Sequence, residues 1–70
     1  MLPLHIVLLR ELRRSNGTAT DRELFRAVRK TLGDDISRSQ FNKVLMVLEV
    51  RGIIVVEPLK RDLKIVRLIK

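Results

Sequence analysis

The stretch of residues 37–52, SRSQFNKVLMVLEVRG, most constrains how this chain can fold. Ser37 and Gln40 have the spacing of a capping box, in which two side chains satisfy free backbone N–H groups at the start of a helix. Apolar residues then recur at helical spacing and define a face to be buried: Phe41, Val44, Leu45 and Leu48. Gly52 ends the pattern, and the β-branched run IIVV follows directly. The sequence therefore predicts a helix over residues 37–52 that leads straight into a strand.

A second capping box lies upstream. Thr20 and Glu23 frame the sequence T-D-R-E, which predicts a helix that begins at Asp21. Gly33 is typical of a residue that ends a helix in the left-handed conformation. The apolar stripe of this helix is expected to contain Leu24, Phe25, Val28 and Leu32, with Ala27 as a small contact residue. Since only the acidic turn at residues 34–36 follows, we expect two helices joined by a tight turn.

Residues 3–14 are predicted to form a further helix, with Pro3 in the first turn, where its missing N–H has no consequence. The main apolar arc is expected to contain Leu2, Ile6, Leu8, Leu9 and Leu12. Leu4 and Val7 fall away from that arc. They are interpreted either as the exposed apolar surface that is normal in a small domain or as a subunit contact. His5, among them, is interpreted as an ordinary packed or partly exposed helix residue.

Two strands complete the predicted order. Residues 53–57 are rich in β-branched side chains, and Pro58 is expected to end this strand. Residues 63–69 are expected to return as a second strand, so that about five residues form the connecting loop. A very short strand at Thr18–Thr20 is a further candidate. We expect a single small α+β domain over residues 1–70, in the order helix, helix, helix, strand, strand.

The composition argues against several classes of function. The chain has no cysteine and one histidine, which leaves no ligand set for a metal site. It also lacks tyrosine, tryptophan, a glycine-rich phosphate loop and a carboxylate pair outside the acidic turn. Its apolar runs are too short to span a membrane. We therefore expect a cytoplasmic protein that is not an enzyme, with no cofactor, no small-molecule effector and no membrane partner.

The charge points to an acidic partner. Fifteen Lys and Arg against eight Asp and Glu give a net charge of +7. Such a balance favours nucleic acid first and an anionic membrane surface second. High charge content with few Asn and Gln also leans toward a thermophilic source.

The order of elements resembles the winged-helix variant of the helix-turn-helix family of DNA-binding domains. The resemblance rests on the capped segments TDRELFRAVRKTLG and SRSQFNKVLMVLEVRG, the turn DDI between them, and the passage LEVRGIIVVEP, and it covers nearly the whole chain. It implies that the helix over residues 37–52 enters the major groove of duplex DNA. It also implies that residues 57–67 form a wing on the neighbouring backbone or minor groove, as in a transcription regulator or a small nucleoid-associated protein. Winged-helix domains also serve as protein–protein interaction modules, which is the alternative.

The helix over residues 37–52 supplies side chains suited to such contacts. Arg38 and Lys43 can bond guanine or a phosphate, and Asn42 can bond adenine at two atoms. Ser39 can reach a phosphate or a base edge, and Met46 can touch a thymine methyl group. The alternative for each residue is a solvated helix face.

The expected hairpin repeats the positive charge. Lys60 and Arg61 at its tip, with Lys64 beyond them, are candidates for phosphate or minor-groove contacts. The alternative is a strand edge that charge protects from aggregation.

Apolar residues on the exposed half of the same helix suggest a second copy of the chain. Met46, Val47 and Val50 lie near that surface, and Leu4 and Val7 are interpreted as part of the same contact. A homodimer would place two recognition helices on one duplex about one helical turn apart.

Overall fold

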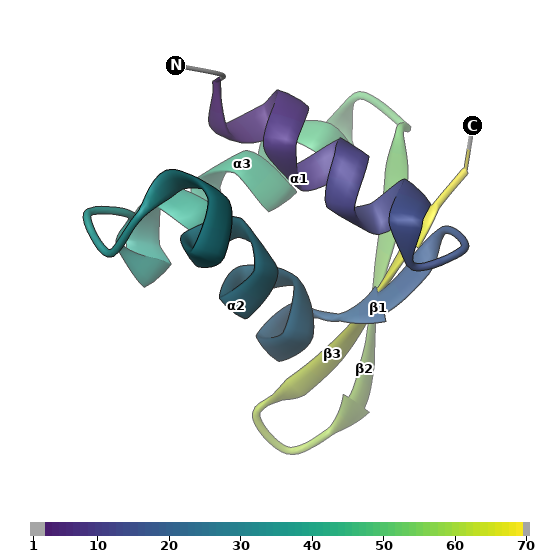
Figure 1. The fold of residues 1–70 in the computed structure, drawn as a ribbon. Helices are drawn as coiled ribbons and strands as arrows, with labels where there is room; N and C mark the ends of the chain where they lie inside the picture. The colour runs from purple at the N-terminus through teal and green to yellow at the C-terminus, as the bar shows by residue number, and fades with distance from the viewer. Residues whose placement is uncertain (1–2, 70) are drawn as a thin grey trace.

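A computed structural model describes residues 3–69 of the chain (Figure 1). It is a small α+β structure of three helices and a three-stranded antiparallel sheet, which agrees with the predicted fold class, three helices and two-stranded hairpin. The candidate strand at Thr18–Thr20 is present. The elements in chain order are α1 (Leu4–Arg14), β1 (Thr18–Thr20), α2 (Asp21–Leu32), α3 (Arg38–Val50), β2 (Ile54–Lys60) and β3 (Leu63–Leu68).

Both predicted capping boxes are confirmed. The Thr20 hydroxyl accepts from the Glu23 N–H at 3.1 Å, and the Glu23 carboxylate accepts from the Thr20 N–H at 3.2 Å. Ser37 and Gln40 make the same reciprocal pair, at 3.1 and 2.9 Å. A side-chain N-cap is worth about 1 kcal/mol, so each box helps to decide where its helix begins.

The end of α2 departs from the expected conformation. Gly33 has the positive φ of 98° that favours glycine, but its ψ of 175° is extended rather than left-handed helical. The chain therefore leaves α2 in an extended direction into the acidic turn, instead of folding back over the last helical turn.

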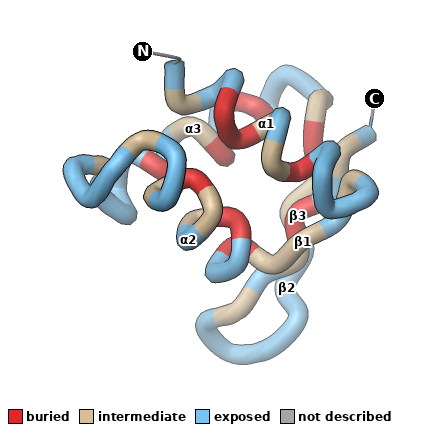
Figure 2. Tube along the Cα trace, in the orientation of Figure 1, coloured by how far each residue is buried: buried red, intermediate tan, exposed pale blue. Residues whose placement is uncertain are grey.

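The core lies where the helices and the sheet face one another (Figure 2). The apolar stripes predicted for α2 and α3 are confirmed, since Leu24, Val28 and Phe41 are almost fully buried. The members of these stripes that are only half-buried still pack against the core: Phe25, Leu32 and Val44. The buried core residues are Val7, Leu8, Leu12, Leu24, Val28, Phe41, Leu45, Leu48, Ile54 and Val66.

The predicted buried face of α1 is wrong in part. Val7 is completely buried, whereas Ile6 is 42% exposed. The buried stripe follows residues 4, 7, 8, 11 and 12, and Glu11 on that stripe interrupts its apolar pattern in the sequence. The Glu11 carboxylate is tolerated on this stripe because it forms an ion pair with Arg14 at 3.3 Å. Val7 therefore cannot contribute to a subunit contact, and Leu2, on the expected arc, lies outside the described residues.

The strand β3 is central in the sheet, whose order is β1-β3-β2 with both pairings antiparallel. Val66 lies opposite Ala19 on one side and Val56 on the other, and it is fully buried. The short strand β1 runs between α1 and α2, so it joins the helical part of the chain to the hairpin formed by β2 and β3 (Figure 1).

The predicted hairpin loop is also wrong. The strand β2 continues through Pro58 to Lys60, with an irregularity in the register between these two residues, and the loop is only Arg61 and Asp62. A proline within a strand is tolerated at a sheet edge, where its missing N–H breaks no interior ladder. Because β2 is an edge strand, Pro58 does not end it. The hairpin is consequently longer than expected and extends beyond the helices (Figure 1).

Within residues 3–69, no helix combines the length and apolar character needed to cross a membrane.

Candidate nucleic-acid interface

The exposed face of α3 is the one that the sequence predicts. Phe41, Leu45 and Leu48 hold the helix on the core, while Ser39, Asn42, Lys43 and Met46 are exposed. Met46 is 63% exposed although it is apolar. The four exposed residues form a strip along the side of α3 away from the core, which we call the α3 strip.

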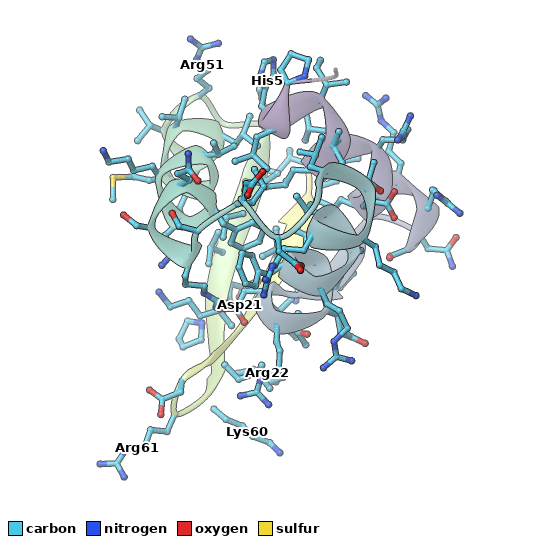
Figure 3. All side chains as sticks on the ribbon, turned by 60° about the vertical axis from the view of Figure 1, so that its left-hand side comes forward. His5, Asp21, Arg22, Arg51, Lys60 and Arg61 are labelled. Carbon is cyan, nitrogen blue, oxygen red and sulfur yellow. The ribbon has the colours of Figure 1, made fainter. Side chains whose placement is uncertain are left out.

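The β2–β3 hairpin carries exposed cations near its tip. Figure 3 shows Lys60 and Arg61 at the end of the hairpin farthest from the helices. Glu57 pairs with Arg67 at 3.4 Å. Within residues 3–69, Lys60, Arg61 and Lys64 have no carboxylate partner at ion-pair distance. The hairpin therefore presents uncompensated positive charge.

The α3 strip and the hairpin border one concave surface. A hollow of about 190 Å³ lies between them, with Asn42, Met46 and Glu49 of α3 on one side and Lys64 and Val56 on the other, and the buried Asp21 also borders it. The structure thus brings together three of the predicted site residues from segments that are distant in the sequence. Lys60 and Arg61 lie outside this hollow, at the tip of the hairpin (Figure 3).

A buried carboxylate that the sequence analysis missed holds this surface together. Asp21, the first residue of α2, is 5% exposed. It accepts from the Arg38 guanidinium at 2.6 Å and from the Lys64 backbone N–H at 3.2 Å. A buried carboxylate is tolerated only when it is paired and hydrogen-bonded. Asp21 therefore joins the start of α2 to the start of α3 and to the hairpin, and Figure 3 shows it between these elements.

Arg38 has a structural contact that the prediction did not include. Besides the ion pair with Asp21, its guanidinium lies 5.1 Å from the ring centre of Phe25 and 5.6 Å from that of Phe41. The two rings pack edge to face, with centres 5.1 Å apart. The Arg38 side chain is still 43% exposed. It fixes the start of α3 on α2 and leaves part of its charge facing solvent.

The outer face of α2 is a second basic surface that the sequence analysis did not assign. Four cations border a shallow hollow of about 360 Å³ that also includes Phe25 and Asp34. The cations are Arg22, Arg26, Arg29 and Lys30. Their spacing of four, seven and eight residues places them on one side of a helix, and this spacing was the signal available in the sequence. The neighbouring acidic turn is partly neutralised, since Asp34 pairs with Arg29 at 3.1 Å.

The described residues contain no cluster of three or more His, Cys, Asp or Glu side chains that could hold a metal ion. His5 is exposed on α1 and borders a different hollow, between α1 and α3. Of the residues predicted at a dimer contact, Val47 and Val50 are 50% and 82% exposed, while Leu4 is half-buried against the core.

Comparison of the chain with protein-family models, with curated proteins and with solved structures gives no match. Function is therefore inferred from the geometry and charges described above.

Proposed function

We propose that this chain is a winged-helix protein that binds duplex DNA, with the α3 strip in the major groove and the β2–β3 hairpin as the wing. The observation that carries the proposal is the concave surface shared by the α3 strip and the hairpin. The three helices and the three-stranded antiparallel sheet are compatible with a winged-helix layout. The net charge of +7 supports an anionic partner.

The side chains suggest a division of labour. Asn42, Ser39 and Lys43 offer the groups that read base edges in the major groove, and Met46 offers an apolar contact for a thymine methyl group. Lys60, Arg61 and Lys64 offer cations for phosphates or the minor groove. Arg38, held by Asp21, would serve a phosphate near the start of α3 rather than a base. The cations of α2, which border a separate hollow, would add further phosphate contacts.

Fluorescence anisotropy with a labelled duplex, titrated at several salt concentrations, tests the proposal. We expect Lys60→Ala with Arg61→Ala, and Asn42→Ala with Lys43→Ala, each to weaken binding by about tenfold or more. A matched control removes two exposed cations of α1, Arg10 and Arg13, and should have a smaller effect. The proposal is wrong if the chain binds no duplex at low salt, or if the control pair matters as much as the other two.

This function fits a transcription regulator or a small nucleoid-associated protein. A protein–protein role is the second candidate, because Met46, Val47 and Val50 expose apolar surface on α3. With Val7 in the core and Leu4 half-buried, a homodimer that uses the predicted contact residues would have to be built mainly on this end of α3. Measuring the mass of the protein in solution, with and without DNA, tests that arrangement.

A further inference from the structure

The flank of α3 away from the hairpin borders a separate hollow, which we call the α1–α3 groove. It has a volume of about 250 Å³ and lies between His5 of α1 and the side of α3 that faces α1. The residues of α3 and its end that border it are Lys43, Val44, Val47, Leu48 and Arg51. Figure 3 shows His5 and Arg51 together at the end of the molecule opposite Lys60 and Arg61.

The chemistry of this groove is apolar at its centre and basic at its rim. Val44, Val47 and Leu48 supply the apolar atoms, and Val47 is half-exposed. Lys43, Arg51 and His5 stand around them, and none of the described residues that border the groove is acidic. Glu49, the acidic residue of α3, lies on the opposite flank, where its carboxylate accepts from the Val56 N–H at 3.4 Å.

We propose that the α1–α3 groove binds an acidic amphipathic segment of another protein. One apolar side chain of that segment would sit against Val44 and Val47, and its carboxylates would pair with Lys43 and Arg51. An amphipathic helix docked in a groove is a common mode of recognition and needs this combination of apolar anchor and charged rim. The volume is below the range of about 300–1,000 Å³ that is usual for small-molecule sites, which favours a single inserted side chain.

A second copy of this chain is a poor match for the same groove. In a symmetric dimer the same surface patch meets itself, so the Lys43 and Arg51 side chains of the two copies would face one another. Like charges placed opposite each other oppose association. A head-to-tail contact would avoid this clash but would leave an open assembly unless the rotation closes it into a ring.

The inference goes beyond DNA binding and does not rest on it. Lys43 is the one residue shared by the α3 strip and the α1–α3 groove. The test therefore leaves Lys43 unchanged and alters Val47 and Arg51, which are not among the proposed DNA contacts.

The probe is a labelled helical peptide of about sixteen residues, with leucine at every third or fourth position and glutamate beside the leucines. A second peptide keeps the leucines and carries lysine in place of glutamate. Anisotropy measures both against the full chain and its variants Val47→Asp and Arg51→Glu. The matched controls are Ile69→Asp and Arg10→Glu: Ile69 is 54% exposed against 50% for Val47, and each control repeats the charge change elsewhere.

We expect the acidic peptide to bind about tenfold or more tightly than the lysine peptide. Val47→Asp and Arg51→Glu should each weaken it by about tenfold, because a docked segment depends on a few central contacts. Ile69→Asp and Arg10→Glu should change it by less than about twofold, as remote surface charges do in moderate salt. A thermal melt of each variant verifies that it is folded, which is expected at such exposed positions.

Three results would overturn the proposal. Equal weakening by Val47→Asp and Ile69→Asp would show that the peptide is attracted only by the overall charge. A chain that is dimeric in solution and becomes monomeric with Val47→Asp would show that a second copy occupies the groove. Competition between peptide and duplex, with Val47→Asp weakening both equally, would assign the groove to the DNA-binding surface. If the unaltered chain binds the acidic peptide but does not bind duplex DNA, only the proposed DNA-binding function is refuted.

Discussion

The helices α2 and α3 begin in the same way, but the chemistry of their outer surfaces differs. Each starts with a capping box of the same geometry. The outer face of α2 carries four cations, Arg22, Arg26, Arg29 and Lys30. The outer face of α3 carries a hydroxyl, an amide, one lysine and two exposed apolar side chains, in the order Ser39, Asn42, Lys43, Met46 and Val50. The same local device therefore positions two chemically different surfaces.

This contrast separates general attraction to DNA from discrimination between base sequences. Contacts to phosphates hold a protein on DNA but carry little information about its sequence, whereas amides and apolar groups in the major groove distinguish bases. In the proposed complex α2 and the hairpin supply attraction, and α3 supplies discrimination. The two helices can cooperate only while the Phe25–Phe41 packing and the Asp21–Arg38 ion pair keep them in register.

Removing the Phe41 side chain should have the largest effect, because both surfaces depend on the packing of Phe41 against Phe25. Phe41 is fully buried and packs edge to face on Phe25. Truncating a buried phenylalanine to alanine costs about 3–5 kcal/mol, and a domain of this size has only about 4–10 kcal/mol in total. We expect Phe41→Ala to be largely unfolded at moderate temperature, as measured by circular dichroism during thermal melting. Phe41→Leu, which retains most of the apolar volume, should fold; equal stability of Phe41→Ala and the unaltered chain would contradict the packing.

Neutralising Asp21 should weaken the contact between the start of α2 and the start of α3 without unfolding the chain. Breaking a fully buried ion pair costs about 3–5 kcal/mol, but the Arg38 side chain is 43% exposed and water can solvate part of its charge. We therefore expect Asp21→Asn to cost about 1–2 kcal/mol, measured by denaturant titration. The control Asp34→Asn alters a carboxylate that is 92% exposed and should change stability by less than about 0.5 kcal/mol. Similar losses in both variants would refute the role assigned to Asp21.

The two surfaces should respond differently to salt. Removing Arg22 and Arg26 should weaken duplex binding to all sequences alike and reduce the slope of log affinity against log salt by about 2, since each phosphate contact contributes about 0.9. Removing Asn42 should cost about 1–3 kcal/mol on the preferred sequence, relax the choice of base, and leave the slope unchanged. Competition titrations on randomised duplexes at several salt concentrations measure both. If Asn42→Ala changed the slope and the arginine pair changed the sequence preference, the proposed division would be reversed.

Local patterns predicted most of the helical structure. The capping boxes depend on side chains three residues apart, so Thr20 with Glu23 and Ser37 with Gln40 could be recognised without tertiary information. The buried and exposed faces of α3 followed from helical spacing for the same reason. The buried face of α1 was predicted wrongly because Glu11 lies on it. Its carboxylate is at the edge of the core beside Arg14, which a single sequence does not show. The end of β2 was predicted wrongly at Pro58 because a proline in a strand depends on whether that strand is at an edge, and the strand order is a tertiary property.

The exposed residues of the candidate site could be predicted from the sequence, but the buried contacts of Asp21 could not. Exposure of Asn42, Lys43 and Met46 follows from periodicity. The contacts of Asp21 do not, because Arg38 is 17 residues and Lys64 is 43 residues away in the sequence. A carboxylate in the first turn of a helix is also favoured by the helix dipole alone, so its type and position gave no reason to expect a buried ion pair.

The smallest predicted effect distinguishes the two capping boxes from one another. Glu23 in the α2 box ionises, whereas Gln40 in the α3 box does not. The backbone N–H of Thr20, and then its side chain, donate to the Glu23 carboxylate and hold its pKa below its ordinary value of 4.5, with a smaller contribution from Arg26. A lowered folded-state pKa stabilises the folded chain above the unfolded value, and this stabilisation is lost as the pH falls through the folded pKa.

Acid should therefore loosen the start of α2 and leave the start of α3 intact. Amide hydrogen exchange at Thr20 and at Ser37, whose N–H groups donate to the Glu23 and Gln40 side chains, measures the difference. It is followed from pH 6 down through the range of carboxyl titration near pH 4 and corrected for the intrinsic effect of pH. The variant Glu23→Gln should remove the pH dependence at α2, because it makes that box the same as the box at α3. Equal loosening of both helix starts in the unaltered chain would show that acid acts on the fold as a whole rather than on the Thr20–Glu23 cap.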